Sequence, residues 1–411
     1  IVLADVKDLP VDPQETPYKG TCSKCKGTEF VPDTDVMDTW NTSSLTPYLC
    51  YQLYAQEQLG NMSVFDAQIT KKKPFLPMSM RPQAHDIIRT WAFDTIVKLW
   101  MHTENVPWEE IVISGHVLSD SKEKLSKSKG NSKLTPESLL QTYPADVIRF
   151  WTASGSLGQN VAFSENQLKI GQRLVTKLWN AFRFVEEHVV TVAPDVDPGN
   201  LGASNEWLLH NASHCFAQYT TYFEQHEFGL ALGCVEKFFW HDFCDNYLEL
   251  IKDQLFKPEQ YDQHTVLATR WTLYQVGLRI LQMYAPYLPH LTETIYQQVY
   301  KKTNAAASVH QTRFAAVQLP REFAVSAGNM EALLQVIAQV RRLKTEQQLS
   351  LKTPLQTLLV TGDNQAVLET IKLYDQLLRG IAQAIEISYK AGDKPAGLEQ
   401  RDGLWHAVVR V

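Results

Sequence analysis

The sequence predicts a multidomain fold, in which a mixed α/β region is followed by an all-α region and then by a small α+β module. Short apolar runs in the first part, such as residues 110–114, are typical of buried strands. From about Gln167 onward, apolar residues recur at steps of three and four, which is typical of amphipathic helices. Residues 326–411 mix both patterns. At roughly 150 residues per domain, 411 residues allow two to four domains.

We expect four parts along the chain. These are an irregular connector at 1–30, a mixed α/β region at 31–165, a helical region at 166–320 and an α+β module at 321–411. Pro and Lys in the connector favour loop structure.

Individual elements follow from periodicity and from breaking residues. We expect helices at 85–101, 174–185, 228–255, 267–281 and 331–344, and strands at 110–114, 356–361 and 384–389. Pro286 and Pro289 should end the helix that precedes them, because proline lacks the amide hydrogen that a helix interior requires. Residues 304–325 are rich in Ala and Ser and are expected to form a linker.

Composition excludes several classes of protein. Hydrophobic residues make up 44% and charged residues 20%, which are ordinary globular values. No apolar run reaches about 18 residues, so we expect no membrane span. Six cysteines are too few for a disulfide scaffold, which favours the reducing cytoplasm. The net charge of -6 gives no overall attraction to nucleic acid, so such binding would need local basic patches.

A lysine-rich segment is the most informative part of the sequence. Residues 121–133 read SKEKLSKSKGNSK, with five lysines and one glutamate. Ser, Gly and Asn favour a loop, and ammonium groups on a loop can bind polyphosphate oxygens as point charges. A lysine run of arbitrary order is usually a solvated surface loop. The order of the residues argues against that alternative here.

Lys124-Leu-Ser-Lys-Ser128, followed by Lys129-Gly-Asn131, closely resembles the Lys-Met-Ser-Lys-Ser motif of class I aminoacyl-tRNA synthetases. Leu125 stands where Met is usual. Residues 143–149, Tyr-Pro-Ala-Asp-Val-Ile-Arg, resemble the segment that follows this loop in the family. The resemblance implies that Lys127 is the main catalytic phosphate ligand and Lys124 a helper. It also places Ser126 and Ser128 at bound ATP.

Two further segments resemble valyl-tRNA synthetases: Asp35-Val-Met-Asp-Thr-Trp40 and His85-Asp-Ile-Ile-Arg-Thr-Trp91. The resemblance implies that Trp40 and Trp91 line a valine pocket, since flat indoles form rigid apolar walls. Core packing is the alternative for each tryptophan. Asp86 would approach the ribose of the adenylate, and Gly115 would lie near adenine.

One residue near Gly115 departs from the family pattern. The family has a histidine before this glycine, whereas the chain has Ser114 there and His116 after it. A structural role for His116 is therefore as well supported as a role in binding.

The helical region also resembles a known module. Residues 239–249 and 285–293 resemble the anticodon-binding bundle of valyl-, isoleucyl-, leucyl- and methionyl-tRNA synthetases. From periodicity, most of the aromatic residues in these segments belong to the core. Arg341, Arg342 and Lys344, with Lys352, form a local basic cluster that could bind tRNA phosphates. A solvated helix face is the alternative.

Cys22 and Cys25 have the spacing of half a zinc knuckle. Structural Zn²⁺ needs two more ligands, and the sequence has no second Cys-x-x-Cys pair. In the family a partner pair can lie upstream, so the resemblance implies only an incomplete Zn²⁺ site. Cys215, Cys234 and Cys244 fall in helical stretches and are expected to be small buried apolar residues.

Together these motifs imply the C-terminal half of a class I synthetase specific for valine. That half would contain the second half of a nucleotide-binding, Rossmann-like catalytic domain and the helical anticodon-binding domain. The implied substrates and partners are ATP with Mg²⁺, valine and tRNA(Val), and we expect a monomer with no membrane association. The chain has no His-x-Gly-His sequence and no inserted editing domain. We therefore expect it to be inactive alone.

Two alternatives remain open at this point. One is a non-catalytic module that binds tRNA or a protein partner. The other, within the same class, is an isoleucyl-tRNA synthetase.

Overall fold

The fold is described from a computed structural model, which covers residues 1–36, 38–50, 53, 77–118, 135–189, 196, 200–314 and 323–411. Packing divides the chain into two compact units, Ile1–Gly115 and His116–Val411. The division falls inside the 31–165 range that the sequence suggested as one part. The physical reason is that the helices after residue 135 pack onto the helical region, as described below.

The first unit contains one parallel strand pair and a helical run. Its elements are η1 (Val6–Asp8), α1 (Thr39–Ser43), β1 (Met78–Ala84), η2 (His85–Ile87), η3 (Ile88–Ala92), α4 (Phe93–Thr103) and β2 (Trp108–Ser114). The predicted strand at 110–114 is confirmed. The predicted helix at 85–101 is helical throughout, but η2 is a 3-10 helix, η3 is π-helical and only α4 is an α-helix. Strand β1 pairs in parallel with β2, with Met78 opposite Trp108. It was not predicted, because its polar and proline-containing sequence lacks a strand pattern.

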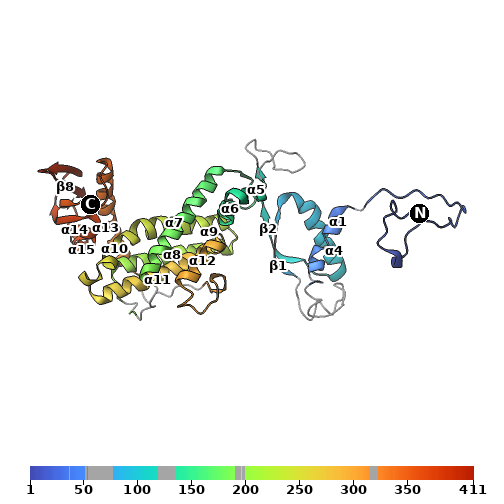
Figure 1. The fold of residues 1–411 in the computed structure, drawn as a ribbon, viewed down its shortest axis with the longest axis horizontal. Helices are drawn as coiled ribbons and strands as arrows, with labels where there is room; N and C mark the ends of the chain where they lie inside the picture. Colours follow the sequence, from blue (N-terminus) through green and yellow to red (C-terminus); the bar gives the residue numbers. More distant parts are fainter. Residues whose placement is uncertain are drawn as a thin grey trace. The chain divides into compact units, whose positions relative to one another are not determined.

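The second unit begins with two small elements and continues as a helical bundle. Its first elements are β3 (Val117–Leu118), α5 (Pro136–Thr142), α6 (Ala145–Ala153), β4 (Val161–Ala162), α7 (Glu165–Val189), α8 (Ala203–Glu224), α9 (Phe228–Lys237), η4 (Phe238–Tyr247), α10 (Leu248–Phe256), η5 (Pro258–Gln260), α11 (Gln263–Tyr284), α12 (Pro289–Val299) and η6 (Val309–Gln311). Helices α7, α8, α9 and α11 lie side by side in the bundle (Figure 1).

The long helices confirm the helical periodicity of the sequence. Helices α7 and α11 include the predicted segments 174–185 and 267–281. Helix α11 ends at Tyr284, and Pro289 is the first residue of α12, so the two prolines break the helix as expected.

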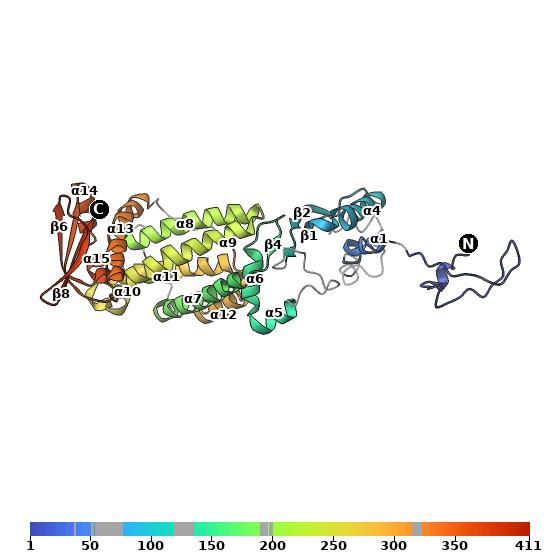
Figure 2. The same cartoon turned by 90° about the horizontal axis from the view of Figure 1, so that it is seen from above.

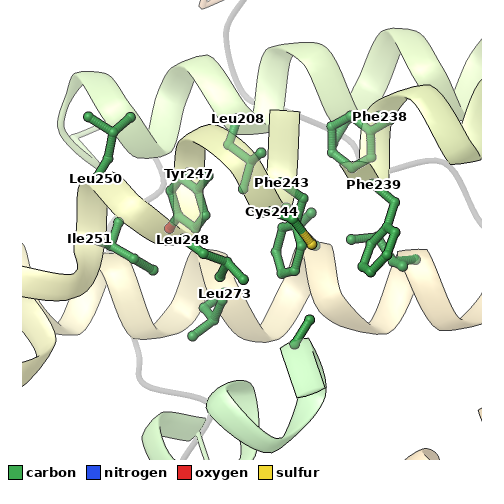
Figure 3. Close-up of a cluster of buried hydrophobic side chains, with 14 of the residues drawn as sticks. Leu208, Phe238, Phe239, Phe243, Cys244, Tyr247, Leu248, Leu250, Ile251 and Leu273 are labelled. Atoms are coloured by element: carbon green, nitrogen blue, oxygen red, sulfur yellow. The ribbon is translucent and has the colours of Figure 1, made fainter. Parts of the chain in front are cut away.

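The predicted helix at 228–255 is present, but its middle is not α-helical. Residues Phe238–Tyr247 form the π-helical segment η4 between α9 and α10. Three rings four residues apart lie along one buried line of this segment, where Phe243 stacks with Phe239 and Tyr247 at centroid distances of 6.2 Å. Figure 3 shows this aromatic line between α8 and α11. A spacing of three and four residues does not distinguish π from α helix, so the sequence could not reveal it.

The last part of the second unit is the α+β module. It consists of α13 (Ala324–Glu346), β5 (Leu355–Gly362), α14 (Gln365–Lys372), α15 (Asp375–Ala382), β6 (Ala384–Ala391), β7 (Gly397–Arg401) and β8 (Leu404–Arg410). The sheet order is β6-β5-β8-β7, with only the β7–β8 pair antiparallel. The helix predicted at 331–344 and the strands at 356–361 and 384–389 are confirmed. Figure 2 shows this sheet at one end of the bundle.

One continuous hydrophobic core joins the bundle and the module. It includes bundle residues such as Phe182 and Tyr284 and module residues such as Leu358 and Val409. Within the described ranges, no helix is long and apolar enough to cross a membrane.

A buried polar network crosses the bundle core. Asn205 on α8 donates to the carbonyl of Leu201 at 2.7 Å, and its Oδ1 accepts from the hydroxyl of Tyr247 at 2.7 Å. Thr269 on α11 donates to Gln254 at 2.8 Å. Because buried polar atoms are costly without partners, this network specifies how these helices pack together.

Candidate active-site and tRNA-contact residues

The first unit brings Trp40 and Trp91 into one apolar cluster. Trp91 is 5% exposed and stacks on Trp108, with ring centroids 5.4 Å apart. The guanidinium of Arg81 lies 3.9 Å from the centroid of Trp91. Trp40 is half-buried and packs against the same cluster, together with Met78 and Ile87. Two segments that the sequence singled out separately are therefore neighbours in space.

Local hydrogen bonds explain how these two segments are held. Asp38 is the N-cap of α1 and accepts from the backbone N–H of Trp40 at 3.0 Å. The indole N–H of Trp91 donates to the carbonyl of Ser43, at the end of α1, at 2.9 Å. The aspartate of the Asp-Thr-Trp segment thus has a capping role, and Trp91 joins α1 to η3. Trp91 therefore packs in the core of this unit, independently of any contact with a ligand.

The two predicted nucleotide contacts of the first unit lie at strand ends. Asp86 is exposed in η2, directly after β1, and Gly115 directly follows β2. Because β1 and β2 are parallel and Ala84 pairs with Ser114, both residues lie at the same carboxyl edge of the strand pair. Carboxyl edges of parallel strands are the usual place for nucleotide sites in α/β folds.

The lysine loop itself lies outside the described residues. Residues 119–134 include the four predicted ATP contacts Lys124, Ser126, Lys127 and Ser128. On its C-terminal side, Thr135 caps α5 in a capping box with Ser138.

On the N-terminal side of the loop, His116 has a structural position. Its backbone N–H donates to Asn160 at 2.8 Å, and its carbonyl accepts from Val161 at 2.9 Å. These contacts hold β3 against β4.

The segment after the loop is anchored to the bundle. The Asp146 carboxylate on α6 accepts from the backbone N–H groups of Leu291 at 2.7 Å and His290 at 3.3 Å, in the first turn of α12. Arg149 donates to the carbonyl of Pro286 at 2.7 Å. The two charged residues of the Asp-x-x-Arg pattern therefore attach α6 to the turn between α11 and α12. The sequence singled out this motif but not this role.

The predicted basic cluster separates into three different environments. Arg342 is exposed and pairs with Glu346 at 2.9 Å. Arg341 is half-buried and donates to Oδ1 of Asn246, on η4, at 3.1 Å. Burial lowers the pKa of the Arg341 guanidinium. The three residues thus do not form one phosphate-binding face.

Lys344 differs from the expectation. It is 1% exposed, and its ammonium group donates to the carbonyls of Leu351, Thr353 and Ala382 at 3.0, 2.7 and 2.9 Å. Burial lowers its pKa to about 8. All three protons of the ammonium group are engaged, so Lys344 joins α13 to α15 instead of facing a phosphate.

A groove of about 860 Å³ opens between η4, α10, α13 and α15, and sequence reasoning did not find it. Its basic lining residues are Lys177, Lys252, Lys257, Arg341, Lys344 and Lys352, and its acidic ones are Asp245, Glu249 and Asp253. The acidic residues each pair with a lysine of the groove. Phe256 and Tyr261 add aromatic surface. Residues from 177 to 383 meet here, which no local sequence signal could reveal.

The cysteine pair near the N-terminus was tested as a metal site. Cys22 and Cys25 lie on a turn closed by the Cys22 N–H donating to the carbonyl of Gly27 at 2.9 Å. Hydrogen bonds from the backbone of Cys25 and then of Lys24 lower the pKa of Cys22. Among the residues that the structure describes, no group of three or more His, Cys, Asp or Glu side chains could hold a metal ion. Two thiols do not complete a tetrahedral zinc site, so zinc remains a prediction.

Two family models match the chain. Residues 11–164 match tRNA synthetases class I (I, L, M and V), and residues 205–359 match the anticodon-binding domain of tRNA ligase. In solved structures, the LeuRS–tRNA–LeuAMS ternary complex from Agrobacterium radiobacter K84 is similar in fold, with a TM-score of 0.50 and 14% identity, over 95% of this chain and 44% of that chain.

Curated relatives narrow the family further. Valine–tRNA ligases of Rickettsia felis and Rickettsia prowazekii are each 36% identical over 96% of this chain, which spans 44% and 47% of their lengths. The valine–tRNA ligase of Wolbachia pipientis wMel is 38% identical over 88% of this chain and 40% of its own. These matches favour valine over the isoleucine alternative and a synthetase over an unrelated binding module. Over these matched residues the chain is similar to valine–tRNA ligases, and it spans about half the length of these curated relatives.

Proposed function

We propose that this chain forms part of an enzyme that activates valine with ATP and transfers it to tRNA(Val). The observation that carries the proposal is the 36% identity to valine–tRNA ligases over 96% of the chain. The chain spans less than half of that relative, so the complete reaction is proposed for the gene product that contains these residues. Six free thiols fit our further proposal of a cytoplasmic location.

In the proposed reaction, the valine carboxylate attacks the α-phosphorus of ATP. Valyl-adenylate forms, pyrophosphate leaves, and the valyl group then passes to the 3′ end of the tRNA. Lys127, assisted by Lys124, stabilises the leaving pyrophosphate, with Ser126 and Ser128 beside it. Asp86 and Gly115 contact the ribose and the adenine, which their shared position at one strand edge supports. ATP is expected with Mg²⁺, which adds positive charge at the phosphates.

The tryptophan cluster suggests different roles for its two predicted pocket residues. Trp91 is covered by Trp108 and Arg81, whereas Trp40 is half-buried, so part of its indole remains open. We therefore propose that Trp40 contacts the valine side chain and that Trp91 supports it from behind. An apolar wall of this kind rejects an isosteric hydroxyl only weakly, a behaviour for which valyl-tRNA synthetases are themselves a known example.

For tRNA, we propose that the groove beside Arg341 holds nucleotides of the anticodon loop. Apart from Lys344, whose ammonium group is bound to carbonyls, its five basic side chains outnumber its three acidic ones, and its aromatic surface can stack on bases. The η4, α10 and α13 sides of the groove fall within the matched anticodon-binding region, whereas Lys177 and the α15 side lie outside it. Arg342 is a candidate phosphate contact at the exposed face of α13.

Binding of tRNA to the chain tests the second half of this proposal. We expect tRNA(Val) to bind more tightly than a tRNA with an unrelated anticodon, and the preference should persist at higher salt. Weak binding that is equal for both tRNAs and is abolished by salt would leave only phosphate attraction and contradict an anticodon site. Arg341→Gln should reduce the preference, whereas Arg410→Gln, at the end of β8 and outside the groove lining, is the matched control.

Amino-acid activation tests the first half. In the gene product that carries these residues, Lys127→Ala should slow valine-dependent exchange of pyrophosphate into ATP by about 100-fold or more, the scale of losing one transition-state donor. Lys133→Ala, in the same segment, is the control. Unchanged exchange in Lys127→Ala would contradict the assigned role, and equal exchange with isoleucine would contradict the valine assignment.

A further inference from the structure

Two cysteines from neighbouring helices of the bundle form a close thiol pair. Sγ of Cys215, on α8, lies 3.7 Å from Sγ of Cys234, on α9. Each thiol also lies 3.6 Å from the backbone carbonyl of the other cysteine. The sequence predicted only small buried residues at these positions. A disulfide has an S–S distance of about 2.05 Å, so a shift of less than about 2 Å would join the pair.

The two thiols differ in access to solvent. Cys215 is 7% exposed, whereas Cys234 is partly exposed. Sγ of Cys234 also contacts Oε1 of Gln218 at 3.4 Å, and this contact is exposed. A small reagent can therefore approach Cys234 from solvent, but it cannot approach Cys215 in the same way.

The pKa values of the two thiols also favour Cys234 as the more reactive one. The hydrogen bond from Cys215 and the charge of Lys237 lower the pKa of Cys234, although burial acts against them. The pKa of Cys215 is raised, first by its hydrogen bond to Cys234 and then by burial. Because the thiolate is the reactive form, Cys234 has the properties of an attacking thiol and Cys215 those of a resolving thiol.

We propose that Cys215 and Cys234 form a reversible oxidation site, at which a peroxide converts the thiol pair to a disulfide between α8 and α9. The Cys234 thiolate attacks one peroxide oxygen, the O–O bond breaks, and a sulfenic acid forms while hydroxide leaves. The Cys215 sulfur then attacks the sulfenic sulfur, the S–O bond breaks, and the Cys215 proton leaves with hydroxide as water. The sum is two thiols and hydrogen peroxide giving one disulfide and two waters.

Cys244 provides an internal comparison. It lies on η4 within the buried aromatic cluster, where Figure 3 shows its sulfur among apolar side chains. Burial raises the pKa of its thiol to about 12. We therefore expect Cys244 to be slow towards peroxide and towards alkylating reagents under native conditions.

The test treats the folded chain with hydrogen peroxide, blocks the remaining thiols with an alkylating reagent and identifies disulfide-linked peptides by mass spectrometry. The chain should carry Cys22→Ser and Cys25→Ser, because that exposed pair can also be oxidised. We expect a linked pair of peptides that contains Cys215 and Cys234. Its mass should be lower than that of the two reduced peptides by two hydrogen atoms, and treatment with a dithiol should separate the peptides. Native alkylation should modify Cys234 at least about 10-fold faster than Cys244.

Single variants distinguish the two roles. In Cys215→Ser, peroxide should leave a sulfenic acid on Cys234 that a dimedone probe traps, and in Cys234→Ser, Cys215 should stay reduced. The oxidised chain should unfold at a higher temperature than the reduced chain, and Cys244→Ser should still form the disulfide. Oxidation of Cys234 to sulfinic acid while Cys215 remains a free thiol would overturn the proposal. So would equal oxidation of Cys244.

Discussion

The carboxylate of Asp146 caps the first turn of α12 by accepting the backbone N–H of Leu291 at 2.7 Å. The residue at the N-cap position of α12 is Leu288, which has no side-chain acceptor, so Asp146 supplies the cap from α6. A carboxylate there also interacts favourably with the positive end of the helix dipole. The segment that follows the lysine loop is thereby attached to the helical bundle.

Replacing Asp146 should destabilise the second unit. Asp146→Ala leaves two backbone N–H groups without their partner, and we expect the free energy of unfolding to fall by about 1–3 kcal/mol. Asp146→Asn keeps an acceptor oxygen and should lose less. Urea denaturation measures both. Asp363→Ala is the control, since its pair with Arg410 is exposed and should be worth less than about 1 kcal/mol.

The hydroxyl of Tyr247 should stabilise the core of the bundle. The hydroxyl donates to Oδ1 of buried Asn205. Tyr247→Phe therefore removes a hydrogen-bond donor from this buried oxygen. We expect a loss of about 1–3 kcal/mol in the free energy of unfolding. Tyr18→Phe, at an exposed ring, should change it by less than about 0.5 kcal/mol. Equal unfolding curves for Tyr247→Phe and the parent chain would contradict this network.

Glu236 should make stability depend on pH. Burial raises the pKa of this carboxyl from 4.5 to about 7 in the folded chain. Between these values the folded chain binds the proton more tightly, so the stabilisation is complete below pH 4.5 and is lost as pH rises through 7. As pH rises through this range, the free energy of unfolding of the parent chain should fall by about 1–3 kcal/mol more than that of Glu236→Gln. This figure is reduced because the carboxyl is partly exposed. Parallel pH profiles of the two proteins would contradict the shift.

Replacing Lys344 should change stability but not tRNA binding, whereas replacing Arg342 should change tRNA binding but not stability. Lys344→Met leaves three buried carbonyls without their donor, and we expect it to cost about 2–4 kcal/mol of stability. Arg342→Ala should leave stability within about 0.5 kcal/mol, because its pair with Glu346 is exposed.

If Arg342 contacts a tRNA phosphate, Arg342→Ala should make the plot of log affinity against log salt concentration less steep, by about 0.7–0.9 in slope. Lys344→Met should leave that slope unchanged wherever the chain is folded. A reduced slope in Lys344→Met alone would reverse the two assignments.

The sequence predicted the long helices other than α8, and the principal strands, because apolar spacing reports directly on which face of an element is buried. It did not predict α14, α15, β7 and β8. These short elements are held by the sheet and by α13, and their own sequence patterns are too brief to distinguish. The sequence also did not predict the π-helical form of η4, because residues four apart already share one face of an α-helix.

For the site, the sequence alone identified the lysine motif, the two tryptophan segments and, through them, the family, because these depend on the order of residues along the chain. Only the tertiary structure decided which of these residues meet and which are buried. Arg342 and Lys344 are two residues apart and both basic, yet one is exposed and the other faces three carbonyls. Burial and hydrogen bonding depend on segments distant in sequence, such as α13 and α15, and therefore on how the chain packs.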